Sequence, residues 1–318
     1  MHKPGEEVRP IVPNKGYYTC QQSQCLHCIL APAVFRNEHV LKDALTLIRR
    51  MECMQTGPNL RVTTFDVTAL YPSIDLERGL NSLRWFLDTF CVEYQDKDLK
   101  DLIMVLARFV LTHCYITCPE VSQHPFHQLI GTAMGTTFAV VYANIHMIFI
   151  EWNIVYSFKQ CIRLYNRFLD DGICFWVGSD AEFLVFSEAL GKVDPLIRII
   201  WTKLTLHAIY LDLSLQISHN TIHYEVYSKP GNAFAYLPMG SFHVRKTFPE
   251  FIKTCLQRGL THSSDYSRWV PYCQLLYSKL RRRGYGDSFL TAVFGKVTWG
   301  DRLHLLFPIK KPAREFDL

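Results

Sequence analysis

The chain has 318 residues, of which 49% are hydrophobic and 14% are aromatic. A chain of this length and composition can bury one large core or two smaller ones, which excludes a disordered protein. Met1 is not followed by a basic patch and an apolar run, so no secretory signal is visible. The longest apolar stretch, residues 138–152, contains Asn144 and His146 and is shorter than the ~20 residues of a membrane-spanning helix. We expect an intracellular protein without a membrane segment, and we interpret this stretch as a buried helix.

The net charge of +5 is unevenly distributed. From residue 229 onward the sequence holds 15 Lys and Arg against 6 Asp and Glu, which is +9 and leaves −4 upstream. A basic C-terminal third favours a polyanionic partner, and a solvated basic surface is the alternative.

The eleven cysteines are irregularly spaced and mostly lie in apolar segments, which argues for free thiols rather than a disulfide framework. Cys20, Cys25 and Cys28 with His27 form the one cluster that could bind zinc. A second pair of ligands at a suitable distance is missing, so we expect no zinc site.

Hydrophobic spacing and turn residues predict the following elements in chain order. The opening, with three prolines before residue 14, has room only for short extended pieces. A helix is expected at residues 38–51, a strand at 60–67, helices at 76–90, 98–114 and 136–156, and a hairpin at 162–177. A helix at 180–190, strands at 208–217 and 221–228, and a mainly helical region after 229 complete the list.

This order of elements predicts an α+β fold, an antiparallel sheet with helices on one face. We divide the chain into residues 1–228 and a second domain at 229–318. Its small core is expected around four residues, namely Phe251, Trp269, Leu275 and Leu276.

Three carboxylates stand out within this pattern. Asp66 lies at the end of the first predicted strand, and Asp170 and Asp171 lie in the predicted hairpin turn. Pairing the two segments in one sheet would gather the acids at one edge, where they would repel one another unless a cation neutralised them. Mg²⁺ accepts oxygen ligands of this kind, and two such ions can drive phosphoryl transfer. The alternative for each acid alone is a turn or helix-capping residue.

The sequence segments around these acids, together with a glycine-rich segment between them, resemble the three successive palm motifs of reverse transcriptases. They are FDVTALYPSI at 65–74, GTAMGT at 131–136 followed by Ala143-Asn144, and RFLDD at 167–171. Finer features resemble the Penelope-like retroelements, which are related to telomerase-type enzymes: YLDL at 210–213, YSKP at 227–230, Tyr236-Leu237, SFH at 241–243, Arg258-Gly259 and RGY at 283–285. HKP at 2–4 and RPIV at 9–12 resemble the fingers motif of that family.

The resemblance implies a right-hand polymerase palm with partial fingers and a helical thumb. Asp66 and Asp170 would be the essential metal ligands, Asp171 a supporting acid and the carbonyl of Val67 a further ligand. Tyr71 would lie under the incoming sugar and exclude a 2′-hydroxyl, with a core aromatic as the alternative.

The same resemblance assigns the substrate contacts. Lys3 and Arg9 would contact the triphosphate, Gly131 would pass close to the template and Gly135 to the nascent base pair, and Lys203 is a candidate to protonate pyrophosphate. Six basic residues of the thumb-like region would track phosphates of the primer and template duplex. They are Arg245, Lys246, Arg268, Arg281, Arg282 and Arg283.

We therefore expect an RNA-directed DNA polymerase that uses an RNA template, a DNA primer, deoxynucleoside triphosphates and two Mg²⁺ ions, with Mn²⁺ as the other metal that carboxylates accept. The family role implies a nuclear location. The chain departs from the family in extent, because upstream fingers elements and a GIY-YIG endonuclease signature are missing. A truncated or domesticated remnant that binds nucleic acid without catalysis is therefore one alternative. A family B DNA polymerase, which shares the Leu-Tyr-Pro-Ser-Ile wording, is another, but no Asp-Thr-Asp motif follows.

Overall fold

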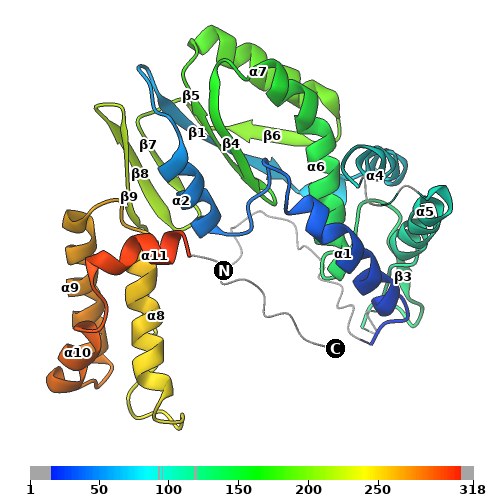
Figure 1. Cartoon of the computed structure of the whole chain (residues 1–318). Coiled ribbons are helices and arrows are strands. Elements are labelled where there is room, and N and C mark those ends of the chain that lie inside the picture. The colour runs from blue at the N-terminus through cyan, green and yellow to red at the C-terminus, as the bar shows by residue number, and fades with distance from the viewer. Residues whose placement is uncertain (1–15, 92–93, 95, 118–119, 309–318) are drawn as a thin grey trace, which may run out of the picture. The chain divides into compact units, whose positions relative to one another are not determined.

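The computed structural model in Figure 1 describes residues 16–308 except 92, 93, 95, 118 and 119. The chain forms two compact units, which we describe one at a time. Of the described residues, the first unit contains those within 16–42, 63–174 and 178–203, and the second contains those within 43–62, 175–177 and 204–308.

A four-stranded sheet is centred in the first unit, with its strands in the order β4-β5-β1-β6. The strands are β1 (Arg61–Thr68), β4 (Ile162–Phe168), β5 (Asp171–Trp176) and β6 (Arg198–Trp201). β1 and β6 pair antiparallel, with Asp66 opposite Ile200. The predicted strand at 60–67 and hairpin at 162–177 are confirmed, whereas β6 was not predicted.

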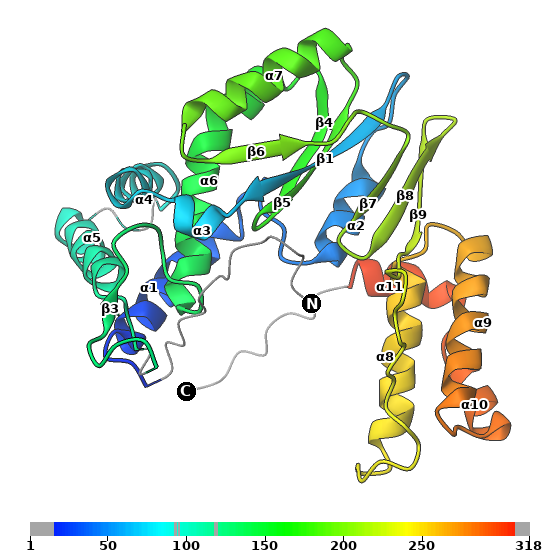
Figure 2. The same ribbon diagram turned by 180° about the vertical axis from the view of Figure 1, so that it is seen from behind.

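Helix α6 is the centre of the first unit. It packs against α1, α4 and α7, and Figures 1 and 2 show it between the sheet and α4. Its fully buried side chains include Val141, Ala143, Ile145, Met147 and Ile148. The helices of this unit are α1 (Cys20–Val34), α3 (Leu70–Ser73), α4 (Leu76–Phe90), α5 (Lys97–Thr112), α6 (Thr137–Ser157) and α7 (Asp180–Val193). Two short strands, β2 (Tyr115–Ile116) and β3 (Phe126–His127), pair beside them.

α6 is the one helix in the described part of the chain that is long and apolar enough to cross a membrane. Its most apolar window has a mean hydropathy of 1.4, and 72% of that window is buried inside the protein. The expectation of a buried core helix is confirmed.

The helix predicted at 38–51 begins at Ala44, so its predicted first residue was wrong. The backbone N–H of Arg167 donates to the carbonyl of His39 at 2.7 Å, and the N–H of Leu41 donates to the carbonyl of Arg167 at 2.8 Å. These bonds hold residues 39–41 extended beside β4. Helix α2 (Ala44–Cys53) then starts at Asp43, whose carboxylate accepts the N–H of Thr46 at 2.7 Å and caps the helix.

The second unit contains a three-stranded antiparallel sheet in the order β7-β8-β9. Its strands are β7 (His207–Tyr210), β8 (Leu213–Ser218) and β9 (Thr221–Val226). The single strand predicted at 208–217 is therefore two strands. Leu211 has a φ of +53°, a left-handed conformation that turns the chain between them.

The second unit also contains α2, and its region after residue 229 is mainly helical, as predicted, with four helices in the described part. They are α8 (Thr247–Thr261), α9 (Tyr266–Arg282), α10 (Asp287–Phe294) and α11 (Arg302–Leu306), with a short 3₁₀ turn at Trp299–Asp301. Their core includes Leu276, and Phe251 and Trp269 pack against it. Leu275 was expected in this core but is 42% exposed, because the neighbouring Leu276 takes the inward position on α9.

Candidate active site

A backbone hydrogen bond joins the two acidic motifs, which are about a hundred residues apart. The N–H of Val67, near the end of β1, donates to the carbonyl oxygen of Asp170, at the turn between β4 and β5, at 2.9 Å. Asp66 therefore lies beside the turn that carries Asp170 and Asp171. Asp66 and Asp171 are exposed and Asp170 is half-buried. Both motifs thus bring their acidic residues to the same end of the central strands β1 and β5, and the metal-binding role of these residues stays a prediction.

The turn itself is held by a buried arginine. Leu169 has a φ of +56°, which is unfavourable for a branched side chain. Nη1 of Arg167 donates to the carbonyl of Leu169 at 2.7 Å and to Oδ1 of Asn144 at 2.9 Å. The carbonyls of Leu169 and Asp170 are thus both fixed by hydrogen bonds, which restricts the orientation of Asp170.

The charge of Arg167 is balanced inside the protein. Its Nε donates to Oε1 of Glu151 at 2.6 Å, and both side chains have no solvent exposure. The hydroxyl of Tyr165 donates to the same carboxylate oxygen at 3.0 Å. Burial raises the pKa of Glu151, although Arg167 and Tyr165 oppose this effect. Removing one partner of such a pair would leave an uncompensated charge in the core.

Gly172 allows β5 to lie close to β1. A Cβ atom at this position would lie 1.9 Å from Cζ of Phe65, whose side chain is 3% exposed. Phe65 precedes Asp66 on β1, and Gly172 follows Asp171 on β5. A glycine is therefore required where the two acidic motifs meet.

Tyr71 and the glycine-rich loop complete the assembly. The N–H of Thr132 donates to the carbonyl of Tyr71 at 2.8 Å. Gly131 has a φ of +76°, and a Cβ there would lie 2.4 Å from Cα of Pro72, so contact within the protein accounts for this glycine. Tyr71 is half-buried, and its pKa is raised by burial and by the negative charge of Asp170 nearby. The three segments named by the motifs therefore meet at one place.

The donor atoms at this edge suit Mg²⁺, which commonly binds one or two carboxylates and completes its shell with water and substrate phosphates. Asp66 and Asp170 would supply the carboxylates, and the carbonyl of Val67 is adjacent in sequence. Within residues 16–308, apart from the gaps given above, no group of three or more His, Cys, Asp or Glu side chains is arranged to hold a metal ion. Neither the three acids nor the cluster of Cys20, Cys25, Cys28 and His27 forms such a group. Ligation of a metal ion by all three carboxylates stays a prediction.

The remaining residues predicted to contact the substrates are Lys3, Arg9, Gly135 and Lys203. Lys3 and Arg9 lie outside the described residues. Gly135 has a φ of +111°, and Lys203 is exposed after β6.

Of the six basic residues, three have partners within the protein. Arg268 pairs with Asp265 at 2.6 Å, Arg281 pairs with Asp287 at 2.8 Å, and Nε of Arg283 donates to the carbonyl of Tyr236 at 2.7 Å. These contacts support the fold of the second unit. The other three are exposed, namely Arg245, Lys246 and Arg282.

Solved structures share this fold at low sequence identity. Telomerase from Candida albicans, solved with a fragment of telomeric RNA, matches 89% of this chain with a TM-score of 0.60 and 13% identity. Telomerase from Candida tropicalis, also solved with telomeric RNA, matches 89% with a TM-score of 0.51 and 13% identity. The BmCPV RNA-dependent RNA polymerase at its elongation state matches 81% with a TM-score of 0.50 and 8% identity, over 24% of its own chain.

The chain has a polymerase-like fold. It spans about half the length of the two telomerase chains, 48% in each case. No protein-family model matches the sequence, and no curated protein matches it. The likeness therefore establishes the polymerase fold alone.

The buried network behind the site was not predicted, although the sequence carries a signal for it. Asn144 and Glu151 are seven residues apart in a mainly apolar helix, so they lie on one face of α6. Both contact Arg167, which is part of the third motif. Polar residues at such spacing in a buried helix indicate a shared partner, because buried polar groups are nearly always hydrogen-bonded.

Proposed function

We propose that this chain is an RNA-directed DNA polymerase of a Penelope-like retroelement, which extends a primer 3′-hydroxyl with deoxynucleotides on an RNA template. The observation that carries the proposal is the hydrogen bond from Val67 to Asp170, because it brings the two acidic motifs together on a polymerase-like sheet. The order of the three motifs and the contact of the glycine-rich loop with Tyr71 support it.

In the proposed reaction, the acidic residues would bind the metal ions. Asp66 and Asp170, with the carbonyl of Val67, would hold two Mg²⁺ ions, and Asp171 would add negative charge beside them. Bound there, the metal ions would lower the barrier by activating the 3′-hydroxyl and stabilising charge on the phosphate and the leaving group. The rigid turn at Leu169 and Asp170 would keep the carboxylate in place without reorganisation, which favours catalysis.

Tyr71 would select the sugar. Its ring is half-buried beside Asp170, and its backbone is tied to the glycine-rich loop through Thr132. A fixed aromatic ring next to the metal ligands would occupy the space that a 2′-hydroxyl needs. The exposed Arg245, Lys246 and Arg282 would contact phosphates of the primer and template duplex. A nuclear location follows from this role.

Primer extension tests the proposal. The purified chain is given an RNA template, an annealed DNA primer, Mg²⁺ and deoxynucleotides, beside the Asp170→Asn variant. We expect extension by the wild type alone and equal binding of the duplex by both proteins. Asp180→Asn, which changes an exposed acid at the start of α7, is the matched control and should extend normally.

The outcome also separates the alternative function. Equal extension by wild type and Asp170→Asn would contradict the metal assignment. Tight duplex binding without extension by the wild type would favour a remnant that binds nucleic acid without catalysis.

A further inference from the structure

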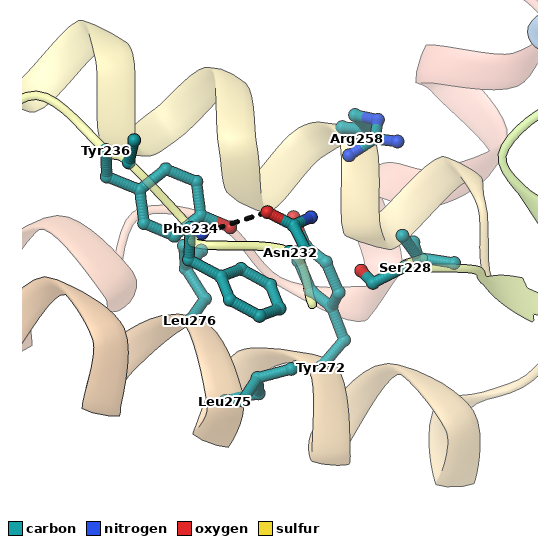
Figure 3. A pocket seen from close by; sticks show the side chains of 10 residues that line it. Ser228, Asn232, Phe234, Tyr236, Arg258, Tyr272, Leu275 and Leu276 are labelled. Carbon is teal, nitrogen blue, oxygen red and sulfur yellow. Dashed lines mark hydrogen bonds between the residues drawn. The ribbon is translucent and has the colours of Figure 1, made fainter. Parts of the chain in front are cut away.

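A pocket of about 260 Å³ lies within the second unit, away from the acidic residues in sequence. It is formed by the segment that follows β9 and by helices α8 and α9 (Figure 3). Its lining combines aromatic rings with amide, hydroxyl and guanidinium groups, and leucine side chains add aliphatic surface. The lining residues labelled in Figure 3 are Ser228, Asn232, Phe234, Tyr236, Arg258, Tyr272, Leu275 and Leu276.

One wall is a tyrosine ring held in place. The hydroxyl of Tyr272 donates to the carbonyl of Cys255 at 2.9 Å. The ring packs against the backbone of Gly259, where a Cβ would lie 2.1 Å from it. With its hydroxyl committed and its ring fixed between two helices, Tyr272 presents an aromatic surface to the pocket.

A second aromatic wall has a constrained backbone. Phe234 has a φ of +44°, a left-handed conformation that is unfavourable for its side chain. Oδ1 of Asn232 accepts the N–H of Phe234 at 2.9 Å, and the carbonyl of Phe234 accepts the N–H of Tyr236 at 2.6 Å. Such backbone strain persists where the surrounding contacts enforce it, and it is concentrated at functional sites.

Charge and hydrogen-bond donors complete the lining. Nζ of Lys279 lies 4.4 Å from the centre of the Phe234 ring. Arg258 is bound to Asp212 through Nε at 3.2 Å and Nη2 at 2.5 Å. Among the residues that the structure describes, no hydrogen bond is made by Nη1 of Arg258 or by the amide NH₂ of Asn232. The pocket therefore combines aromatic surfaces with free donors on Asn232 and on Arg258, whose charge is paired with Asp212, and Lys279 adds a cation beside the Phe234 ring.

We propose that this pocket binds one unpaired nucleotide of a single-stranded nucleic acid. Bases in single strands stack on aromatic side chains and arginine, and their edges accept hydrogen bonds. The amide of Asn232 and Nη1 of Arg258 offer donors to such an edge, and Lys279 offers a cation to the phosphate. An aromatic side chain of a protein partner could stack in the same way, but it would leave Lys279 beside the pocket without an anionic group.

Photocrosslinking tests the proposal independently of nucleotidyl transfer. The protein used is the full chain with the Asp170→Asn substitution, which should not extend primers. A single-stranded RNA that contains 5-iodouridine, and the DNA of the same sequence, are irradiated with the protein, and the labelled peptides are mapped. We expect both strands to label the pocket, at Phe234, Tyr236 or Tyr272, since stacking does not require the 2′-hydroxyl.

Two variants and one control sharpen the test. Phe234→Leu removes the stacking surface and should lower the affinity about fivefold or more, given ~1–3 kcal/mol for each stacked base. Asn232→Asp keeps the oxygen that caps Phe234 but replaces the donor with a negative charge, so it should also weaken binding. Phe242→Leu changes a fully exposed ring on the same segment outside the pocket and should leave binding unchanged.

Thermal melting of each variant checks that the fold is retained. The proposal is overturned if neither strand labels the pocket, or if folded Phe234→Leu binds as tightly as Phe242→Leu. If the wild type fails to extend primers while Asp170→Asn is still labelled at the pocket, the proposed polymerase activity is contradicted and this binding site remains in place.

Discussion

The guanidinium of Arg167 donates a hydrogen bond to the carbonyl oxygen of Leu169 at 2.7 Å, one residue before Asp170. This bond connects the buried core to the turn that carries the acids. Arg167 does not reach the reacting atoms in this arrangement. It acts through the turn and is therefore a positioning residue.

Replacing Arg167 should affect both stability and activity. Arg167→Met leaves Glu151 buried without its cation, which should cost about 3–5 kcal/mol in the free energy of unfolding. Arg167→Lys keeps a charge but loses the planar fork that contacts Glu151, Asn144 and Leu169 together. We expect folded Arg167→Lys to bind duplex normally, to extend primers at least about tenfold more slowly, and to need more Mg²⁺ for half-maximal rate, because a displaced carboxylate would cost ~1.4 kcal/mol or more of transition-state stabilisation.

Urea denaturation and Mg²⁺ titrations of extension measure these effects. Arg163→Met is the matched control, since Arg163 lies on the same strand with an exposed side chain. An unchanged Mg²⁺ requirement in Arg167→Lys would show that the arginine supports only the fold.

Gly172→Ala should separate β5 from β1. The added Cβ would overlap the Phe65 ring at 1.9 Å, and overpacking of this kind costs about 1–3 kcal/mol. Because the same strands carry the acids, we also expect slower extension. Phe65→Leu in the same chain should restore part of both, since a smaller side chain leaves room for the methyl group.

Gly191→Ala is the control for the glycine substitution. It lies inside α7 with no heavy atom within 4 Å of the added Cβ, so it should stabilise the protein by about 0.5–1 kcal/mol. Equal stability of the two variants would contradict the steric role of Gly172.

Long periodic segments were predictable from sequence alone. Helix α4 has the predicted bounds, and α6 and the β4-β5 hairpin differ from prediction by one residue or two. Their apolar spacing, together with a cap such as Asp75, specifies them locally. The meeting of the three motifs was predicted from family resemblance and not from spacing.

Short or tertiary-dependent features were not predictable in the same way. β6 has four residues at the sheet edge, too few for alternation to be recognised. Residues 39–41 are extended because they pair with Arg167, a contact far away in sequence that overrides their helical spacing. Helix α1 does carry a signal, since Leu26 and Leu30 are buried four residues apart, but Pro32 and several cysteines obscure it.

The stability of the first unit should fall between pH 7.5 and 5.5 because of His146. This side chain is 1% exposed, with Nδ1 2.9 Å from Oγ of Ser82 and Nε2 3.3 Å from Oδ2 of Asp194. Burial lowers its pKa below 6.5, an effect that Asp194 opposes and Arg78 supports. Protonation therefore favours the unfolded chain, so the stabilisation is complete above about pH 6.5 and is lost as the pH falls toward the folded pKa, by up to about 1.4 kcal/mol at pH 5.5.

Urea denaturation of wild type and His146→Gln at both pH values measures this contribution. The variant should lose stability at pH 7.5 but show a smaller difference between the two pH values. His124→Gln, at an exposed histidine, should keep the wild-type difference. His262, in the second unit, also has a pKa lowered by burial, so some pH dependence should remain in His146→Gln. An undiminished difference would contradict the role of His146.

Tyr71→Ala tests whether the ring beside Asp170 selects the sugar. The ring is half-buried and its backbone carbonyl is fixed by Thr132, so the space that it fills near the acids should open when it is removed. We expect incorporation of ribonucleotides to rise at least about tenfold relative to deoxynucleotides, since loss of a steric exclusion of ~1.4 kcal/mol gives this factor. Tyr71→Phe keeps the ring and should keep the selectivity, which separates the ring from its hydroxyl. Competition between ribonucleotides and deoxynucleotides in single-nucleotide extension measures the ratio. If Tyr71→Ala extends primers with unchanged selectivity, the ring is a packing residue, because the space that it fills would then not be the space a 2′-hydroxyl needs.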